Sequence, residues 1–180
     1  MTLAGSILSV ALRDWTWEGL NGFLQLRVRE NEAIEYKATF DGSLPDTLVA
    51  MANGDGGYIF VGMSEKGNKM PDQWPLLDGT KNRSESVYSY AVSSTSPIVQ
   101  LDAKAIFHEN GKQVVVVRVP PGSYPPYLAR DKGVRVRAGD GDVAPDIRTL
   151  ELLSHGVKTL LKHASSIDLG CCRQSPGSGS

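Results

Sequence analysis

Three glutamates and a lysine within the first 65 residues are of the types that act on phosphate groups. Glu30 precedes a short segment of alternating apolar and charged residues, and Glu35 and Lys37 lie within that segment. Glu65 comes after the next apolar run. Carboxylate oxygens are the ligands that Mg²⁺ and Mn²⁺ prefer, and a metal held by two or three of them activates water and stabilises a phosphoryl transition state. Lys37 would contact a phosphate beside that metal. The residues therefore predict a catalytic metal site formed by Glu30, Glu35 and Glu65 with Lys37.

The same residues also fit a simpler description. Solvated acids can flank a surface strand, and Lys37 can pair with Glu35 because the two share one strand face. A spacing of five puts Glu30 and Glu35 on opposite faces of a continuous strand. Glu30 can join the others only if the chain bends near Asn31. Both descriptions stay open on the residues alone.

A second set of side chains suits nucleic acid. Arg135 and Arg137 share one face of an alternating segment, and Arg130 and Lys132 come just before them. With Lys37, these cations predict a local basic strip that contacts phosphates, although a solvated strand face explains the four later residues equally well. The chain has 19 Lys and Arg against 20 Asp and Glu, a net charge of -1. Phosphate binding must therefore depend on a local surface and not on the field of the whole molecule.

A glycine-rich turn invites comparison with a phosphate-binding loop. Asn53 and Gly54 end an expected helix, and Gly56 and Gly57 precede an apolar run. A P-loop has the opposite order, with a helix that begins after the glycines and a Gly-Lys-Ser/Thr motif. ATPase activity is therefore not predicted. The simpler prediction is that Gly54 stops the helix and that Gly56 and Gly57 allow a tight start to a strand.

Other chemistries find little support. His155 and His163 are eight residues apart, His108 is remote, and Cys171 and Cys172 are adjacent in a polar tail, so no zinc spacing or disulfide framework is present. No run reaches the ~20 apolar residues of a membrane span. The apolar N-terminal stretch lacks a preceding basic region, which argues against a signal peptide. These features predict a cytoplasmic protein with no membrane partner.

Periodicity predicts an α/β (α+β) fold with a single mixed, mostly antiparallel sheet flanked by helices. Helices are expected over residues 3–26, 45–53, 83–92 and 147–161, and strands over 33–37, 58–63, 98–107, 112–119 and 133–138. The strand over 33–37 should be half exposed. The continuous apolar run over 58–63 should be the central strand, and Asn110-Gly111 should form a hairpin turn.

The segments between these elements also carry predictions. Ser43 should cap the helix over 45–53. Residues 67–82 should form a long surface loop pinned by Trp74, Leu76 and Leu77. The proline-rich segment 120–127 should be a stiff arm that presents Tyr124 and Tyr127.

Five short motifs appear in the order and with the gaps of the Schlafen AlbA-type domain, which the segment from Glu30 to Leu153 resembles. They read Glu-x-x-x-x-Glu-Tyr-Lys, Ala-Asn-Gly-Asp-Gly-Gly-Tyr-Ile-Phe-Val-Gly, Val-x-Val-Pro, Pro-Pro-Tyr and Val-Arg-Val-Arg-Ala-Gly. The residues that match are Glu30, Glu35 and Lys37 in the first motif, Asn53, Gly56, Gly57 and Gly62 in the glycine signature, and Arg137 in the family's Tyr-x-Arg.

The resemblance implies an α/β module of bacterial proteins described as DNA-binding or transcription regulators, often followed by further domains. Older descriptions of the family name a divergent ATPase domain. In animal Schlafens a similar fold is an endoribonuclease with three acids, which by motif would be Glu30, Glu35 and Glu65 here. The third acid of those enzymes is an aspartate, whereas this chain has a glutamate.

The predicted function is therefore nucleic-acid binding, to DNA or RNA, in a regulatory setting. One alternative is an endoribonuclease that uses Mg²⁺ or Mn²⁺, and another is a protein-interaction module that forms a homodimer. The predicted organisation is an N-terminal helical segment over 1–28, an AlbA-type domain over 29–164 and a disordered tail over 165–180.

Overall fold

A computed structural model describes residues 11–155 of the chain. The helical elements are η1 (Leu12–Asp14), α2 (Trp17–Gln25), α3 (Leu44–Ala52) and α4 (Ser84–Ser94), followed by a last helix over 147–155. The strands are β1 (Ile34–Lys37), β2 (Gly57–Val61), β3 (Ser64–Glu65), β4 (Pro71–Gln73), β5 (Leu77–Asp78), β6 (Thr95–Ser96), β7 (Asp102–Phe107), β8 (Lys112–Val119), β9 (Leu128–Ala129), β10 (Gly133–Val134), β11 (Val136–Ala138) and β12 (Gly141–Val143).

A five-stranded mixed sheet forms the centre of the molecule, as predicted. Its strand order is β1-β2-β8-β5, with β7 on the other edge of β8. Only β1 and β2 run parallel, because α3 connects them as a crossover, and the other pairs are antiparallel. Three small sheets accompany it: β3 with β4, β6 with β9 and β10, and β11 with β12.

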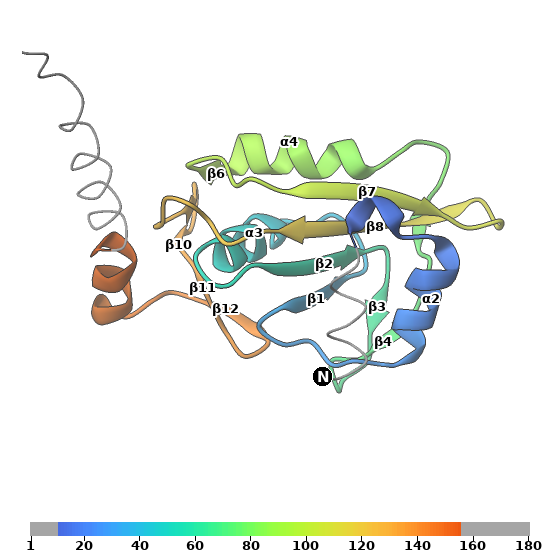
Figure 1. The fold of residues 1–180 in the computed structure, drawn as a ribbon, viewed down its shortest axis with the longest axis horizontal. Helices are drawn as coiled ribbons and strands as arrows, with labels where there is room; N and C mark the ends of the chain where they lie inside the picture. Colours follow the sequence, from blue (N-terminus) through green and yellow to red (C-terminus); the bar gives the residue numbers. More distant parts are fainter. Residues whose placement is uncertain (1–10, 156–180) are drawn as a thin grey trace, which may run out of the picture.

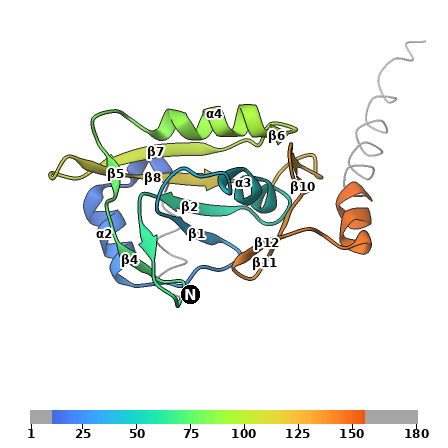
Figure 2. The ribbon, with the colours of Figure 1, turned by 180° about the vertical axis from the view of Figure 1, so that it is seen from behind.

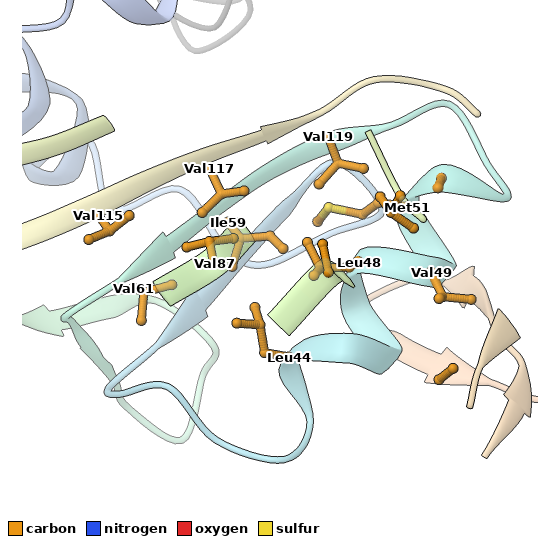
Figure 3. Close-up of a cluster of buried hydrophobic side chains, with 14 of the residues drawn as sticks. Leu44, Leu48, Val49, Met51, Ile59, Val61, Val87, Val115, Val117 and Val119 are labelled. Atoms are coloured by element: carbon orange, nitrogen blue, oxygen red, sulfur yellow. The ribbon is translucent and has the colours of Figure 1, made fainter. Parts of the chain in front are cut away.

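Helices cover both faces of this sheet, which gives the molecule two hydrophobic cores. Alternate residues of β2 and β8 point to opposite faces. Ile59 and Val117 pack with α3 and α4, and Figure 3 shows Leu44 and Leu48 of α3 in one cluster with them. Phe60 and Val116 pack with η1 and α2 on the other side. Accordingly α2 and α3 lie on opposite sides of the sheet in the two ribbon views (Figures 1 and 2).

The N-terminal helix is shorter than predicted. The helical pattern is broken at Trp15 and Thr16, and the Thr16 hydroxyl accepts a hydrogen bond from Gly19 N at 3.3 Å as the N-cap of α2. A threonine cap starts a new helix there because its side chain satisfies a backbone donor that has no intrahelical partner. The part of the prediction over 3–10 lies outside the described residues. So do the predictions for residues 156–180, which include the end predicted for the helix over 147–161, His163, the two cysteines and the tail.

Three details of the loops correct the predictions. The segment over 67–82 is not one loop, because it contains β4 and β5. The Ser43 side chain does not cap α3, and its hydroxyl instead bonds Asp41 at 2.5 Å. Tyr124 is 62% exposed as expected, but Tyr127 is 4% exposed and belongs to the core.

The glycine turn after α3 ends the helix and leads into β2, as predicted, but its left-handed residue is Gly56 and not Gly54. Asn53 is the C-cap of the helix, and Gly56 has a φ of +79° that suits glycine. A Cβ on Gly56 would overlap the carbonyl oxygen of Val119, and one on Gly57 would lie 2.7 Å from the carbonyl oxygen of Ala33. The two glycines thus let the chain enter β2 between its neighbours, and no phosphate-binding role is needed to explain them.

Among the described residues, no helix is both long enough and apolar enough to cross a membrane.

Candidate functional site

Glu35 lies at the centre of a buried ionic network, although strand β1 was expected to be half exposed. Its Oε1 is 2.9 Å from Lys37 Nζ, and its Oε2 is 3.0 Å from Arg137 Nη1. The Glu35 side chain is only 11% exposed, and that of Arg137 only 5%. The charged face of β1 is buried because Arg137, on the β11–β12 hairpin, packs over it.

The network continues from Arg137 into the hairpin and helix α3. Arg137 Nη1 donates to Asp142 Oδ1 at 2.8 Å, and Nη2 donates to the carbonyl oxygen of Asn31 at 2.7 Å. Asp142 Oδ2 accepts a hydrogen bond from Thr47 Oγ1 at 2.6 Å. Arg137 therefore joins three elements distant in sequence: β1, its own hairpin and, through Asp142, α3.

Burial and these partners determine the charge state of the arginine. Burial lowers the pKa of Arg137, but hydrogen bonding to Asp142 and the charges of Asp142 and Glu35 outweigh it, and the pKa is raised. Two carboxylates face two cations, Arg137 and Lys37, so the network is close to neutral. A neutral buried network of this kind holds elements together and has little charge left to attract a phosphate.

Glu30 forms a second, separate cluster. The chain bends at Asn31, as the spacing required, and Glu30 Oε1 accepts a hydrogen bond from Tyr36 N at 2.8 Å at the free edge of β1. Glu30 Oε2 lies 3.2 Å from Lys69 Nζ. Glu65 Oε1 is also 3.2 Å from the same Lys69 Nζ. Glu30 and Glu65 are thus joined by one lysine ammonium group.

The surroundings of Glu30 make its carboxyl an unusually weak acid. Burial raises the pKa of Glu30 to about 7. The hydrogen bond from Tyr36 opposes this shift, the charges on Glu35 and Glu65 add to it, and Lys69 opposes it again. Glu30 is consequently a group that titrates close to neutral pH.

The carboxylates do not fit a three-carboxylate metal centre in this arrangement. Glu35 directs its oxygens at Lys37 and Arg137, whereas Glu30 and Glu65 direct theirs at Lys69. Within residues 11–155 no group of three or more His, Cys, Asp or Glu side chains is placed to hold a metal ion. The catalytic and metal-binding roles predicted for Glu30, Glu35 and Glu65 therefore remain predictions, and we derive no chemical step through a metal.

The predicted basic strip is divided between the interior and the surface. Lys37 and Arg137 are internal. Arg130 and Lys132 are exposed at the turn of the β9–β10 hairpin, where Lys132 Nζ pairs with Asp46 Oδ2 at 2.8 Å. Arg135 follows β10 and is half exposed. Among the residues that the structure describes, Arg130 and Arg135 form no ion pair.

Asn53 fixes the base of that hairpin. Its Nδ2 donates to the carbonyl oxygens of Tyr127 and Arg135, each at 2.8 Å, and its Oδ1 accepts from Tyr127 N at 2.7 Å. These two residues stand immediately before β9 and immediately after β10. Sequence reasoning placed Asn53 in a turn, but only the structure gives it the role of holding the hairpin against the end of α3.

The remaining turn glycine, Gly62, lies where β2 leaves the sheet. Its φ is +107°, and a Cβ would lie 2.9 Å from the backbone oxygen of Gln113 and from the Leu77 side chain. A side chain at this position would therefore push β2 away from β5 and β8.

Sequence reasoning missed Lys69, Asp142 and Thr47 as site residues. Asp142 had a weak signal, because a hairpin turn over residues 139–140 pairs it with Arg137 in register. Lys69 lies four residues after Glu65, with which it pairs, but its contact with Glu30 is tertiary. Thr47 had no signal, since it meets Asp142 only through a tertiary contact.

A cleft of about 700 Å³ opens beside the network, between the end of α3, the β11–β12 hairpin and the last helix. Its lining includes the exposed acids Glu32, Asp55 and Asp146, together with Arg137. Arg137 is already paired with Glu35 and Asp142, so the three acids make this cleft a poor candidate for the nucleic-acid contact.

Comparisons with known proteins agree with the resemblance seen in the sequence. The model of the family described as Schlafen, AlbA_2 matches residues 30–146. A structural match with a TM-score of 0.50 and 23% identity covers 82% of this chain and 94% of an N-terminal domain from Nitrosomonas europaea. That domain belongs to a protein described as related to the ATP-dependent DNA helicase RecG.

A weaker structural match is the DIP2311 protein of Corynebacterium diphtheriae, with a TM-score of 0.43 and 15% identity. It covers 71% of this chain and 26% of that protein. A comparison with curated proteins finds no match.

Proposed function

Because this chain belongs to the Schlafen AlbA_2 family, we propose that it is a nucleic-acid-binding module whose contact surface is the β9–β10 hairpin with Arg135. The observation that carries the proposal is the way the hairpin is held. Asn53 binds both ends of its base, and its turn places Arg130 and Lys132 in solvent. A hairpin that is fixed at its base and carries cations at its turn can contact a phosphate backbone at little cost in conformational entropy.

Charge supports this surface over the other predicted cations. Lys37 and Arg137 are neutralised internally by Glu35 and Asp142, so they have little charge to offer a ligand. Arg130 and Arg135 have no carboxylate partner within the described chain. Lys132 has one, but its side chain is 45% exposed, and exposed ion pairs are weak enough for a phosphate to replace the carboxylate.

DNA is the first ligand to test, because the Nitrosomonas protein that shares the fold is named for a DNA helicase. The probe is a fluorescein-labelled 20-base-pair duplex in an anisotropy titration, with a single-stranded RNA of the same length in parallel. Three phosphate contacts give a slope of about -2.7 for log K against log salt on duplex DNA, or about a 40-fold loss of affinity between 50 and 200 mM salt.

The variant Arg130→Ala/Lys132→Ala/Arg135→Ala should lower the affinity at 50 mM salt by at least about tenfold and flatten the salt dependence, because its phosphate contacts are lost. Lys112→Ala is the matched control. It removes an exposed cation at the start of β8, beside the hairpin turn at the opposite end of the sheet (Figure 1). Equal affinity of the two variants would refute the proposed surface, and no binding of the wild type to either probe would refute the proposed function.

The endoribonuclease alternative can be tested with the same RNA. It predicts cleavage that requires Mn²⁺ and that Glu35→Gln abolishes, and cleavage that persists in this variant would belong to another enzyme. A regulatory role and a homodimer likewise remain predictions. Light scattering of the free chain tests the homodimer directly.

A further inference from the structure

Two carboxylates share a single positive charge at the edge of β1. Lys69 Nζ is 3.2 Å from both Glu30 Oε2 and Glu65 Oε1. The Glu30 side chain is 1% exposed, and its Oε2 has no hydrogen-bond partner within the described chain. Burying a carboxylate oxygen that has no hydrogen bond costs free energy. A nearby cation offsets this cost, and here Lys69 is that cation.

The backbone holds Lys69 in this position. Its carbonyl oxygen accepts a hydrogen bond from Glu30 N at 2.8 Å, so backbone and side chain contact the same glutamate. Its φ is +59°, a left-handed conformation that is uncommon for a residue other than glycine. The loop between β3 and β4 thus keeps a strained backbone at the one residue whose ammonium reaches both acids.

The charges around this ammonium are not balanced. When both carboxyl groups are ionised they carry two negative charges, and one lysine supplies a single positive charge. A small divalent cation meets the same pair with full neutralisation, since such ions bind one or two carboxylates and complete their coordination with water. Lys69 therefore stands at the position that a divalent cation would occupy.

We propose that Lys69 is the resident counter-cation of a two-carboxylate site formed by Glu30 and Glu65, and that it excludes divalent cations from this site in the wild-type chain. The proposal is independent of nucleic-acid binding. It is incompatible with the endoribonuclease alternative, which needs a divalent cation at Glu30 and Glu65.

Lys69→Gly tests the proposal because glycine accepts the positive φ and leaves the backbone oxygen in place for Glu30 N. Mn²⁺ alone is the probe, followed by electron paramagnetic resonance of the free ion and by calorimetry. We expect the wild type to bind no Mn²⁺ at millimolar concentration. Lys69→Gly should bind one ion, at least about tenfold more tightly than any residual binding to the wild type.

Matched variants distinguish the site from general loss of charge. Lys69→Arg keeps a cation at this position and should bind no Mn²⁺. Lys69→Gly/Glu30→Gln should lose the Mn²⁺ binding that Lys69→Gly gains. Lys66→Ala removes the neighbouring exposed lysine, which pairs with Asp72, and should behave as the wild type. Lys69→Asn, which also tolerates a positive φ, serves if the glycine variant does not fold.

Three outcomes would overturn the proposal. One is a wild-type protein that binds one Mn²⁺ and loses it in Glu30→Gln. Another is a folded Lys69→Gly or Lys69→Asn variant, checked by circular dichroism, that binds none. The third is a Lys69→Arg variant that binds Mn²⁺ as Lys69→Gly does.

Discussion

At the scale of single residues, the role of each glutamate depends on the cation that it meets. Glu35 is held by Lys37 and Arg137, whereas Glu30 and Glu65 share Lys69. The simpler description from the sequence, an ion pair between Lys37 and Glu35, is therefore present, but in the interior and not in solvent. Burial makes this pair and its neighbours part of the scaffold.

The titration of Glu30 should make the stability of the protein depend on pH. Its pKa is raised to about 7 from the ordinary 4.5, so the folded state holds this proton more tightly than the unfolded state. Between these two values the folded state binds more protons, and stability falls as pH rises, by at most about 1.4 kcal/mol per pH unit. The stabilisation that comes from this proton is fully present below about pH 4.5 and is lost above about pH 7.

Glu30→Gln removes this titration, and glutamine keeps an oxygen that can accept the hydrogen bond from Tyr36 N. We expect its free energy of unfolding, from urea titrations at four pH values between 4.5 and 7.5, to vary less with pH than that of the wild type. Glu32→Gln, at an exposed position, is the control and should follow the wild type. An unchanged slope in Glu30→Gln would show that the carboxyl does not titrate in this window.

At the scale of elements, Arg137 is the contact that holds the β11–β12 hairpin on β1. It bonds the Glu35 side chain, the Asn31 backbone and Asp142. Asn53 does the same for the β9–β10 hairpin through backbone groups. Two polar residues thus attach two short hairpins, neither of which has enough strand pairing to be stable alone.

Arg137→Met should destabilise the protein by about 3–5 kcal/mol, because Glu35 and Asp142 would keep buried charges without this partner. Urea denaturation measures the loss. Lys132→Ala breaks a half-exposed ion pair, in which the Lys132 side chain is 45% exposed and that of Asp46 14%, and should cost clearly less than Arg137→Met. A loss for Arg137→Met as small as for Lys132→Ala would mean that the network does not hold the hairpin.

At the scale of the whole molecule, one sheet separates two hydrophobic cores, and α2 belongs to one of them. Leu20, Phe23 and Leu24 are fully buried against the sheet. The rings of Phe23 and Phe60 stack with centroids 5.1 Å apart. The segment before residue 29 therefore completes the fold, although the family model begins at residue 30.

Phe23→Ala should destabilise the protein by about 3–5 kcal/mol, since it leaves a cavity between α2 and β2. Gln25→Ala, at an exposed position of the same helix, should change stability by less than about 0.5 kcal/mol. Thermal and urea unfolding of the two variants provide the comparison. A small effect of Phe23→Ala would indicate that α2 does not form part of this hydrophobic core.

The sequence by itself determined the family, the mixed sheet, the central position of β2 and the turn between β7 and β8. These features depend on local periodicity and on glycine positions, which a single segment of chain reveals. The spacing of five made any approach of Glu30 to Glu35 conditional on a bend near Asn31, and only the structure shows that the chain bends there.

Only the tertiary structure decided what the charged residues contact. Arg137 reaches Glu35 across 102 positions of sequence, and Thr47 reaches Asp142 across 95. Nothing local in the chain marks such partners, so the predicted strip of five cations looked uniform although two of them, Lys37 and Arg137, are internal. The electrostatic role of a side chain depends on its burial and on its neighbours in space, and both arise only when the hairpins pack on the sheet.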